Sequence, residues 1–327
     1  MEFIPAKRRF STHASSLNVD RRILEESVKH FGRSSQRATF RRLPGGFMNA
    51  NFLASVDAER FVVRAYSTDA TTADRECDLL SSLAATDVRV PTVLARFDIE
   101  GCAVALVEFI DGVTLEDRLQ MEPAPPLSVY RDIGAQLARI HCITFPETGF
   151  LGPQLRIGRE YDDLGSFVAS YIERVLAMLA DRPDRLDRDV NRRLLHLVRE
   201  RWELVMRTEP RRQLVHCDFN PKNLLVSADA SASVMAVIDW EFCLSGNGLG
   251  DLGNFFRFEY DYPAGAREMF IDGYQSNNPT LPSDWYDASK LIDIGNMCSF
   301  LERREDYQES FHTARTVIAS TLEHFGY

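Results

Sequence analysis

Strand-like and helix-like patterns of apolar positions divide the chain into two parts. Up to residue 109 apolar residues recur every two residues in some segments and every 3.6 residues in others. This predicts short strands together with two helices. The first helix would begin after Asn18 or Asp20 as its cap. The predicted order is a helix over residues 20–31, a hairpin over 40–63 with Gly45-Gly46 at its tip, a third strand over 61–66, a helix over 73–84, a strand over 88–95, and two strands over 97–109 that turn at Glu100-Gly101.

After Ile110 strand signals largely vanish and helical patterns dominate. Helices are predicted over residues 129–143, 166–180 and 189–207, with several more after Arg267. A small mixed part followed by a large helical part predicts an α+β fold with two lobes. We expect a disordered or loosely attached tail over residues 1–17, a β-rich N-lobe over 18–108 and a mainly helical C-lobe over 109–327.

Composition narrows the class of protein. A hydrophobic content of 45% and an aromatic content of 10% are typical of a soluble globular protein. No apolar run approaches the roughly 20 residues that span a bilayer, and the N-terminal residues lack the apolar stretch of a secretory signal, so no membrane association is expected. Six cysteines without a CxxC pair argue against a zinc site or a disulfide framework, which favours the cytoplasm.

The charge distribution bears on the partner. A net charge of −10 argues against nucleic acid as a partner. Residues 240–327 carry 14 acidic and 6 basic side chains, so most of the net negative charge lies in the last third of the chain. If this part faced the active site, it would raise the local concentration of a cationic substrate. A solvated acidic surface that aids solubility is the alternative interpretation.

One loop after a short apolar strand carries the residues of a phosphoryl-transfer site. His216, Asp218 and Asn223 follow the H-x-D-x-x-x-x-N spacing of a kinase catalytic loop, in which the Asp accepts a hydroxyl proton and the Asn binds magnesium. Asp239 ends a second apolar strand, residues 234–238, and is the natural second metal ligand. One carboxylate cannot both bind the metal and accept the proton, so the chemistry requires this set of side chains.

The same loop has a simpler interpretation. An isolated HxD sequence is more often a turn with an Asx cap. Here an apolar strand is predicted on each side of the loop, and a further strand ends in Asp239. This combination favours the catalytic interpretation.

These motifs resemble the aminoglycoside phosphotransferase family, also called choline kinase-like small-molecule phosphotransferases. The resemblance covers roughly residues 20 to 325 and implies a bilobal protein-kinase-like fold with ATP and Mg²⁺ as cofactors. It implies Asp218 and His216 as catalytic-loop residues, the first as base and the second fixing the loop by hydrogen bonds, and Asn223 and Asp239 as metal ligands. Residues 245–254 look like the family stretch that follows the metal strand and opens toward the substrate.

The resemblance also implies nucleotide-binding residues in the N-lobe. Glycine lets backbone N–H groups approach a phosphate closely, and the backbone of the segment between the lobes would read the adenine edge. Arg64 stands where the kinase pattern has Lys, so a nucleotide other than ATP stays open. The implied residues are Gly45, Gly46 and Asn49 in the covering loop, Val62 and Arg64 on the third strand, Glu76 on the following helix, and Glu108 and Ile110 between the lobes.

The expected acceptor is a hydroxyl of a small cationic molecule such as an aminoglycoside-like antibiotic. Its amino groups would be recognised by acidic residues near the metal strand, namely Glu241, Asp251, Glu259 and Asp261. Choline, ethanolamine, homoserine and methylthioribose kinases share these motifs, so a metabolic kinase is the first alternative. A nucleotide-binding pseudokinase scaffold is the second, suggested by Arg64.

Overall fold

The computed structural model describes residues 19–44, 49–67, 70–160, 163–208, 211–277, 281–303 and 307–327, with only the backbone of residues 159 and 160. The chain forms two compact units. The first holds the described residues up to Cys77 together with Thr92–Phe109, and the second holds Asp78–Pro91 together with Ile110–Tyr327. Residues 78–91 therefore belong to the second unit, although the sequence pattern places them in the N-lobe.

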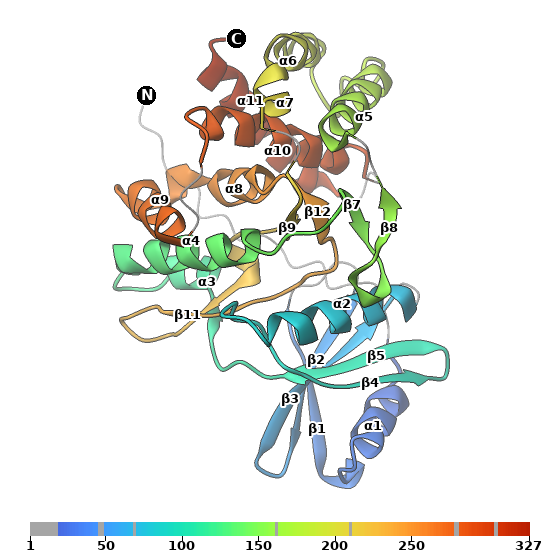
Figure 1. Ribbon diagram of the computed structural model, residues 1–327. Coiled ribbons are helices and arrows are strands. Elements are labelled where there is room, and N and C mark those ends of the chain that lie inside the picture. The colour runs from blue at the N-terminus through green and yellow to red at the C-terminus, as the bar shows by residue number, and fades with distance from the viewer. Residues whose placement is uncertain are drawn as a thin grey trace. The chain divides into compact units, whose positions relative to one another are not determined.

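The first unit is built on one five-stranded antiparallel sheet of order β1-β2-β3-β5-β4 (Figure 1). Asp20 caps the helix that packs against it, because its side chain accepts the N–H of Arg22. Leu24 and Val28 of this helix join the core formed by apolar side chains of the sheet. The elements are α1 (Arg21–His30), a 3₁₀ turn (Ser35–Arg37), β1 (Ala38–Arg42), β2 (Asn49–Val56), β3 (Glu59–Tyr66), β4 (Val93–Ile99) and β5 (Cys102–Glu108), with α2 (Ala70–Leu83) between β3 and β4.

The predicted strand over residues 88–95 is wrong in its first half. The backbone N–H of Arg89 donates to the side chain of Gln136 at 3.1 Å, and its carbonyl accepts the N–H of Val237 at 2.8 Å. Gln136 and Val237 both lie in the second unit, so the backbone of Arg89 bonds to that unit and does not form a strand of the first. Strand β4 begins only at Val93.

Helices make up most of the second unit. The predicted helix over residues 189–207 is interrupted at Trp202, whose indole N–H donates to the carbonyl of Gly165. The helical elements are α3 (Leu115–Leu119), α4 (Leu127–His141), α5 (Leu164–Leu179), α6 (Arg188–Arg201), α7 (Glu203–Met206), α8 (Leu249–Phe256), α9 (Ala266–Asn277), α10 (Trp285–Leu301) and α11 (Gln308–Phe325), with 3₁₀ turns at Pro153–Leu155, Pro221–Asn223 and Glu259–Asp261.

A buried apolar cluster and one close helix pair hold this unit together. One buried cluster joins apolar side chains of α5, α6, α7, α10 and α11. Helices α4 and α9 pack side by side (Figure 1). A Cβ at Gly134 would lie 2.0 Å from the carbonyl oxygen of Phe270, and one at Gly273 would lie 1.9 Å from that of Arg131, so only glycine fits at either position.

Two small sheets of the second unit hold the loop with Asp218 and the segment that ends in Asp239. One has the order β11-β10-β6 and the other the order β8-β7-β12-β9. The strands are β6 (Val113–Thr114), β7 (Gly149–Leu151), β8 (Ile157–Glu160), β9 (Gln213–Val215), β10 (Leu224–Val226), β11 (Val234–Val237) and β12 (Leu244–Gly246). Among the described residues, no helix combines the length and the apolar character that crossing a membrane requires.

Candidate active site

The predicted catalytic loop lies between β9 and β10, and its Asp218 is fixed by two asparagine side chains. Asn220 Nδ2 donates to Oδ1 of Asp218 at 2.7 Å, and Asn223 Nδ2 donates to Oδ2 at 2.8 Å. Each carboxylate oxygen keeps a further lone pair, so Asp218 can still accept a proton from an incoming hydroxyl.

The bonds of Asn223 decide which way its amide faces. Its nitrogen contacts both the backbone carbonyl and the carboxylate of Asp218, and since these groups only accept, the oxygen Oδ1 must face away from them. The backbone carbonyl of Asn223 accepts the N–H of Ile238 at 2.9 Å, which brings Asn223 beside the end of β11, two residues before Asp239. An amide oxygen and a carboxylate are hard donors of the kind that Mg²⁺ prefers, so this donor set fits that ion.

The electrostatics of Asp218 agree with this arrangement. Burial raises the pKa of Asp218, and the nearby carboxylate of Asp239 raises it further, while His216, Arg257 and the hydrogen bond from Asn223 act in the opposite direction. Two carboxylates close enough to repel each other are what a divalent cation would stabilise.

His216 does not act as a proton carrier in this geometry. Its ring is fully buried, its Nδ1 accepts the N–H of Asp218 at 3.2 Å, and its Nε2 donates to the carbonyl of Ile238 at 3.0 Å. Both ring nitrogens are therefore engaged by backbone groups, and Trp240 covers the ring at a centroid distance of 4.5 Å. Through these two bonds His216 ties the loop to the segment before Asp239, and its role in catalysis stays a prediction.

Asp251 is not placed to contact a substrate amine, because its side chain is fully buried. Its Oδ2 accepts the N–H of His216 at 2.7 Å, and its Oδ1 accepts the N–H of Cys217 at 2.8 Å. His141 contacts Oδ2 from the other side at 3.3 Å and is itself bonded to the hydroxyl of Tyr274 at 2.9 Å. Asp251 thus holds the backbone of the catalytic loop.

The other acidic candidates differ in their surroundings. The carboxylate of Glu259 is bonded to the hydroxyl of Tyr286 and lies 3.4 Å from Arg267 and 3.9 Å from Lys290, so its charge is already offset by two cations. This makes it a poor receptor for a substrate amine, contrary to the sequence-based expectation. Asp261 is exposed, and Glu241 is buried two residues after Asp239, so both stay predictions.

The structure brings the predicted Arg64 and Glu76 together in the first unit. Arg64 Nε lies 3.1 Å from Glu76 Oε2, and both side chains are buried. Val62 lies two residues before Arg64 on β3, so the two side chains share a face of the sheet. Asn49 is buried at the start of β2, where its Oδ1 accepts the N–H of Ser67 at 3.4 Å.

Other nucleotide-binding candidates are less well defined. Gly45 and Gly46 lie outside the described residues. The carboxylate of Glu108 accepts from the backbone N–H and the hydroxyl of Thr92, at 3.1 and 2.9 Å, and Ile110 accepts the N–H of Gly112 through its carbonyl. Roles of Glu108 and Ile110 in adenine recognition stay predictions.

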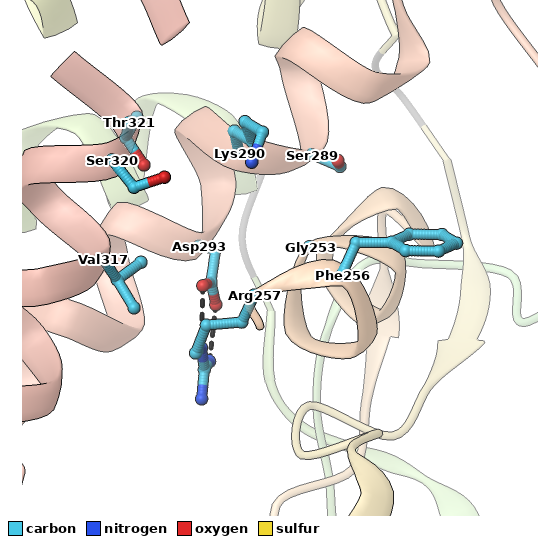
Figure 2. Close-up of a pocket in the computed structure, with 9 residues that line it drawn as sticks. All are labelled: Gly253, Phe256, Arg257, Ser289, Lys290, Asp293, Val317, Ser320 and Thr321. Carbon is cyan, nitrogen blue, oxygen red and sulfur yellow. Dashed lines mark hydrogen bonds and ion pairs between the residues drawn. The ribbon is translucent and has the colours of Figure 1, made fainter. Parts of the chain in front are cut away.

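The sequence pattern does not reveal the pair of Arg257 and Asp293. Arg257 follows α8 and is held by Asp293 of α10 through two hydrogen bonds, of which Figure 2 shows the arrangement. Nothing in the local sequence links two residues this far apart. The cavity beside them, of about 10 Å³, has room for about one water molecule and is too small for an acceptor.

A two-unit α+β fold with this loop is typical of kinase-like phosphotransferases. A family model described as "Phosphotransferase enzyme family" matches residues 39–285, and the chain belongs to that family. The predicted fold class is thereby confirmed, and so is the prediction of a phosphotransferase that acts on a hydroxyl group. No curated protein matches this chain by sequence.

Solved structures share the fold at low sequence identity. A thermostable mutant of the aminoglycoside phosphotransferase APH(4)-Ia, in a ternary complex with ADP and hygromycin B, matches with a TM-score of 0.67 and 19% identity over 91% of this chain and 97% of that chain. Another mutant of the same protein, bound to AMP-PNP and hygromycin B, has a TM-score of 0.65, 20% identity, and coverage of 92% and 97%. Spectinomycin phosphotransferase APH(9)-Ia, in complex with ADP and spectinomycin, has a TM-score of 0.62, 14% identity, and coverage of 92% and 98%.

Proposed function

We propose that this protein is an ATP- and Mg²⁺-dependent phosphotransferase that phosphorylates a hydroxyl of a small, cationic molecule. The observation that carries the proposal is the fixed carboxylate of Asp218, held by Asn220 and Asn223 at 2.7 and 2.8 Å with accepting capacity left on both oxygens. Rigid placement of the base matters because phosphoryl transfer depends mainly on alignment and charge neutralisation.

In the proposed step, the acceptor oxygen forms a bond to the γ-phosphorus while the bond from that phosphorus to the bridging oxygen breaks. The hydroxyl proton passes to Asp218, and the nucleoside diphosphate leaves with the electrons of the broken bond. When bound, magnesium would neutralise the phosphate oxygens. Asn223 Oδ1 and the Asp239 carboxylate would hold it, because these are the hard oxygen donors that flank the base.

In the same proposal, Arg64 binds nucleotide phosphates while Glu76 orients its guanidinium. A guanidinium offers several donors in a plane and can contact a carboxylate and phosphate oxygens at once. The buried ion pair of these two side chains supports the assignment. The complexes of the similar structures with ADP or AMP-PNP support a nucleotide as the phosphate donor.

For the acceptor, we propose an aminoglycoside-like antibiotic, which would make the protein a cytoplasmic resistance enzyme. The hygromycin B and spectinomycin bound to similar structures support this class, and Glu241 and Asp261 are the acidic residues left to receive its amino groups. A metabolic kinase for choline, ethanolamine, homoserine or methylthioribose is the alternative.

A coupled assay for ADP release tests the proposal directly. Purified protein with ATP and Mg²⁺ is supplied in turn with aminoglycosides, spectinomycin, choline, ethanolamine, homoserine and methylthioribose. We expect turnover with at least one aminoglycoside, and a kcat lower by roughly 10² to 10⁴ in Asp218→Asn, as for a lost general base. The matched control is Asp229→Asn, which changes a loop carboxylate bonded to Ser227 and Ser231 and should keep full activity.

Each outcome of this assay separates the candidates. Turnover with choline or homoserine alone would assign a metabolic kinase. Nucleotide binding without turnover across the panel would favour a scaffold. Wild-type turnover in Asp218→Asn would remove this carboxylate from the mechanism.

A further inference from the structure

Tyr66 shares the carboxylate that pairs with Arg64. Its hydroxyl donates to Glu76 Oε2 at 2.8 Å, and this is the same oxygen that lies 3.1 Å from Arg64 Nε. The phenol is 3% exposed and Glu76 is 2% exposed, so the three side chains form a buried cluster within the first unit. No sequence motif singles out Tyr66.

The strand explains how the cluster forms. Arg64 and Tyr66 are two residues apart on β3, so their side chains leave the same face of the sheet. The guanidinium carbon of Arg64 lies 5.4 Å from the centroid of the Tyr66 ring, within the range of a cation–π contact. Tyr66 therefore contacts Arg64 through its ring and Glu76 through its hydroxyl.

These contacts constrain the plane of the guanidinium. Arg is planar, and its usefulness to a phosphate depends on the direction of that plane, whereas the ammonium of Lys is a compact point charge with rotatable donors. Arg64 Nε lies 3.1 Å from Glu76 Oε2 as an ion pair without a hydrogen bond from that nitrogen to a described residue, and the guanidinium carbon lies 5.4 Å from the centroid of the Tyr66 ring. A carboxylate anchored by the phenol cannot rotate freely, so the charge that attracts the guanidinium stays in one place while the Tyr66 ring limits the tilt of its plane.

The protonation state of the phenol is suited to this task. Burial raises the pKa of Tyr66 well above its usual value, and the negative charge of Glu76 raises it further. The hydroxyl consequently keeps its proton at neutral pH and remains a donor. A buried carboxylate that loses such a donor costs free energy, because its remaining charge is less well compensated.

We propose that Tyr66 is a positioning residue for the nucleotide, which fixes Glu76 through its hydroxyl and thereby sets the orientation of Arg64 toward the phosphates. This inference rests on the proposed function, because it takes Arg64 to be the phosphate-binding residue. It predicts that a single oxygen atom in the first unit controls nucleotide affinity without touching the nucleotide.

The test is the affinity for Mg²⁺ with AMP-PNP, measured by calorimetry, which needs no acceptor. Tyr66→Phe removes only the hydroxyl and keeps the buried volume, so the variant should fold, as thermal unfolding would verify. We expect its Kd to rise about tenfold. The matched control is Tyr171→Phe, which removes a phenol bonded to the carboxylate of Glu302 in the second unit and should leave Kd unchanged.

A double-mutant cycle separates orientation from general stability. In an Arg64→Lys background there is no guanidinium plane to orient, so the added Tyr66→Phe change should raise Kd by less than about threefold. A full tenfold loss in both backgrounds would contradict the orienting role, because a merely structural effect of the phenol would not depend on the residue at position 64.

The remaining outcomes distinguish this inference from the proposed function. If Arg64→Ala weakens binding and Tyr66→Phe does not, the inference about Tyr66 is overturned while the phosphate-binding role of Arg64 stands. If Arg64→Ala binds AMP-PNP as tightly as the wild type, Arg64 does not hold the nucleotide and both proposals fail together.

Discussion

Asp251 holds the backbone of Cys217 in a conformation that is unfavourable for a cysteine. The carboxylate Oδ1 of Asp251 accepts the Cys217 N–H at 2.8 Å, and the φ angle of Cys217 is 68°, in the left-handed region. The next residue is the proposed base, Asp218. The buried carboxylate therefore sets the direction in which the base leaves the chain.

Replacing this carboxylate should affect both stability and catalysis. In Asp251→Asn one oxygen becomes an NH₂ group that faces a backbone N–H, either of His216 or of Cys217, so a buried donor loses its acceptor. We expect the free energy of unfolding to fall by about 3 kcal/mol, measured by urea denaturation, with a lower kcat. Asp272→Asn, which alters an exposed ion pair with Arg131, is the control and should change little.

Two substitutions at Cys217 test whether backbone strain or side-chain packing dominates there. Cys217→Gly removes the steric cost of the left-handed conformation, about 1 kcal/mol, and should leave the free energy of unfolding within about 1 kcal/mol of the wild type. Cys217→Val puts a β-branched residue at the same φ and should lower it by about 2 kcal/mol. The reverse order in thermal or urea unfolding would show that packing decides.

The thiol of Cys217 should react slowly at neutral pH. Burial raises the pKa of Cys217 well above its usual value, and the carboxylate of Asp251 raises it further. Only the thiolate is nucleophilic, so a raised pKa leaves less of the reactive form, and alkylation should accelerate as the pH increases. Peptide mapping after iodoacetamide treatment should find the exposed Cys142 modified first; equal rates at neutral pH would contradict the prediction.

Two asparagines of the loop offer a matched test for magnesium. Asn220 and Asn223 both donate to Asp218. The side-chain oxygen of Asn220 accepts the N–H of Lys222, whereas Asn223 is tied through its backbone carbonyl to Ile238, the residue before Asp239. Asn223→Ala should raise the Mg²⁺ concentration for half-maximal activity by about tenfold or more. Asn220→Ala should lower kcat and leave that concentration unchanged, and removal of Mg²⁺ by EDTA should abolish turnover of the wild type.

A shift of the magnesium requirement in both variants would mean that the loop fails as a whole. In that case the separate role of Asn223 as a ligand would be lost. The comparison is informative because the two side chains donate to opposite oxygens of one carboxylate.

Removing one partner of the Arg257–Asp293 pair should lower the free energy of unfolding more than replacing both partners by apolar residues. Both side chains are nearly inaccessible, at 6% and 3%, so removing one partner leaves an uncompensated buried charge. Arg257→Met should lower the free energy of unfolding by about 3 to 5 kcal/mol. The double variant Arg257→Met with Asp293→Leu should lose less than the single variant; a greater loss would show that the pair stabilises beyond charge compensation.

The sequence predicts the parts of this molecule whose partners lie close along the chain. The spacing of Asp218 and Asn223 is a local property of one loop, and the hydrogen bond between their side chains follows from it. The apolar run before Asp239 forms β11 as expected. Helix α1 is capped by Asp20, one of the two predicted caps, because capping depends on the next few residues alone.

Predictions fail where a residue is used by a distant element. Asp251 is one of several acidic residues in the last third of the chain, and its burial depends on His141, 110 positions earlier. Glu259 is paired with Arg267 and Lys290, which removes it from the acidic surface that composition suggests. Net charge counts residues and does not record their partners, so it overstates the attraction available to a cationic substrate.

The connectivity of the second unit limits how this protein can be divided. Residues 78–91 precede the last strands of the first unit, yet the carbonyl of Arg89 accepts the N–H of Val237, two residues before Asp239. A fragment that starts at Ile110 would leave the N–H of Val237, at the end of β11, without its acceptor. The second unit is thus not separable by one cut. Recombining the units of homologous enzymes would need a second junction, so that residues 78–91 stay with the second unit.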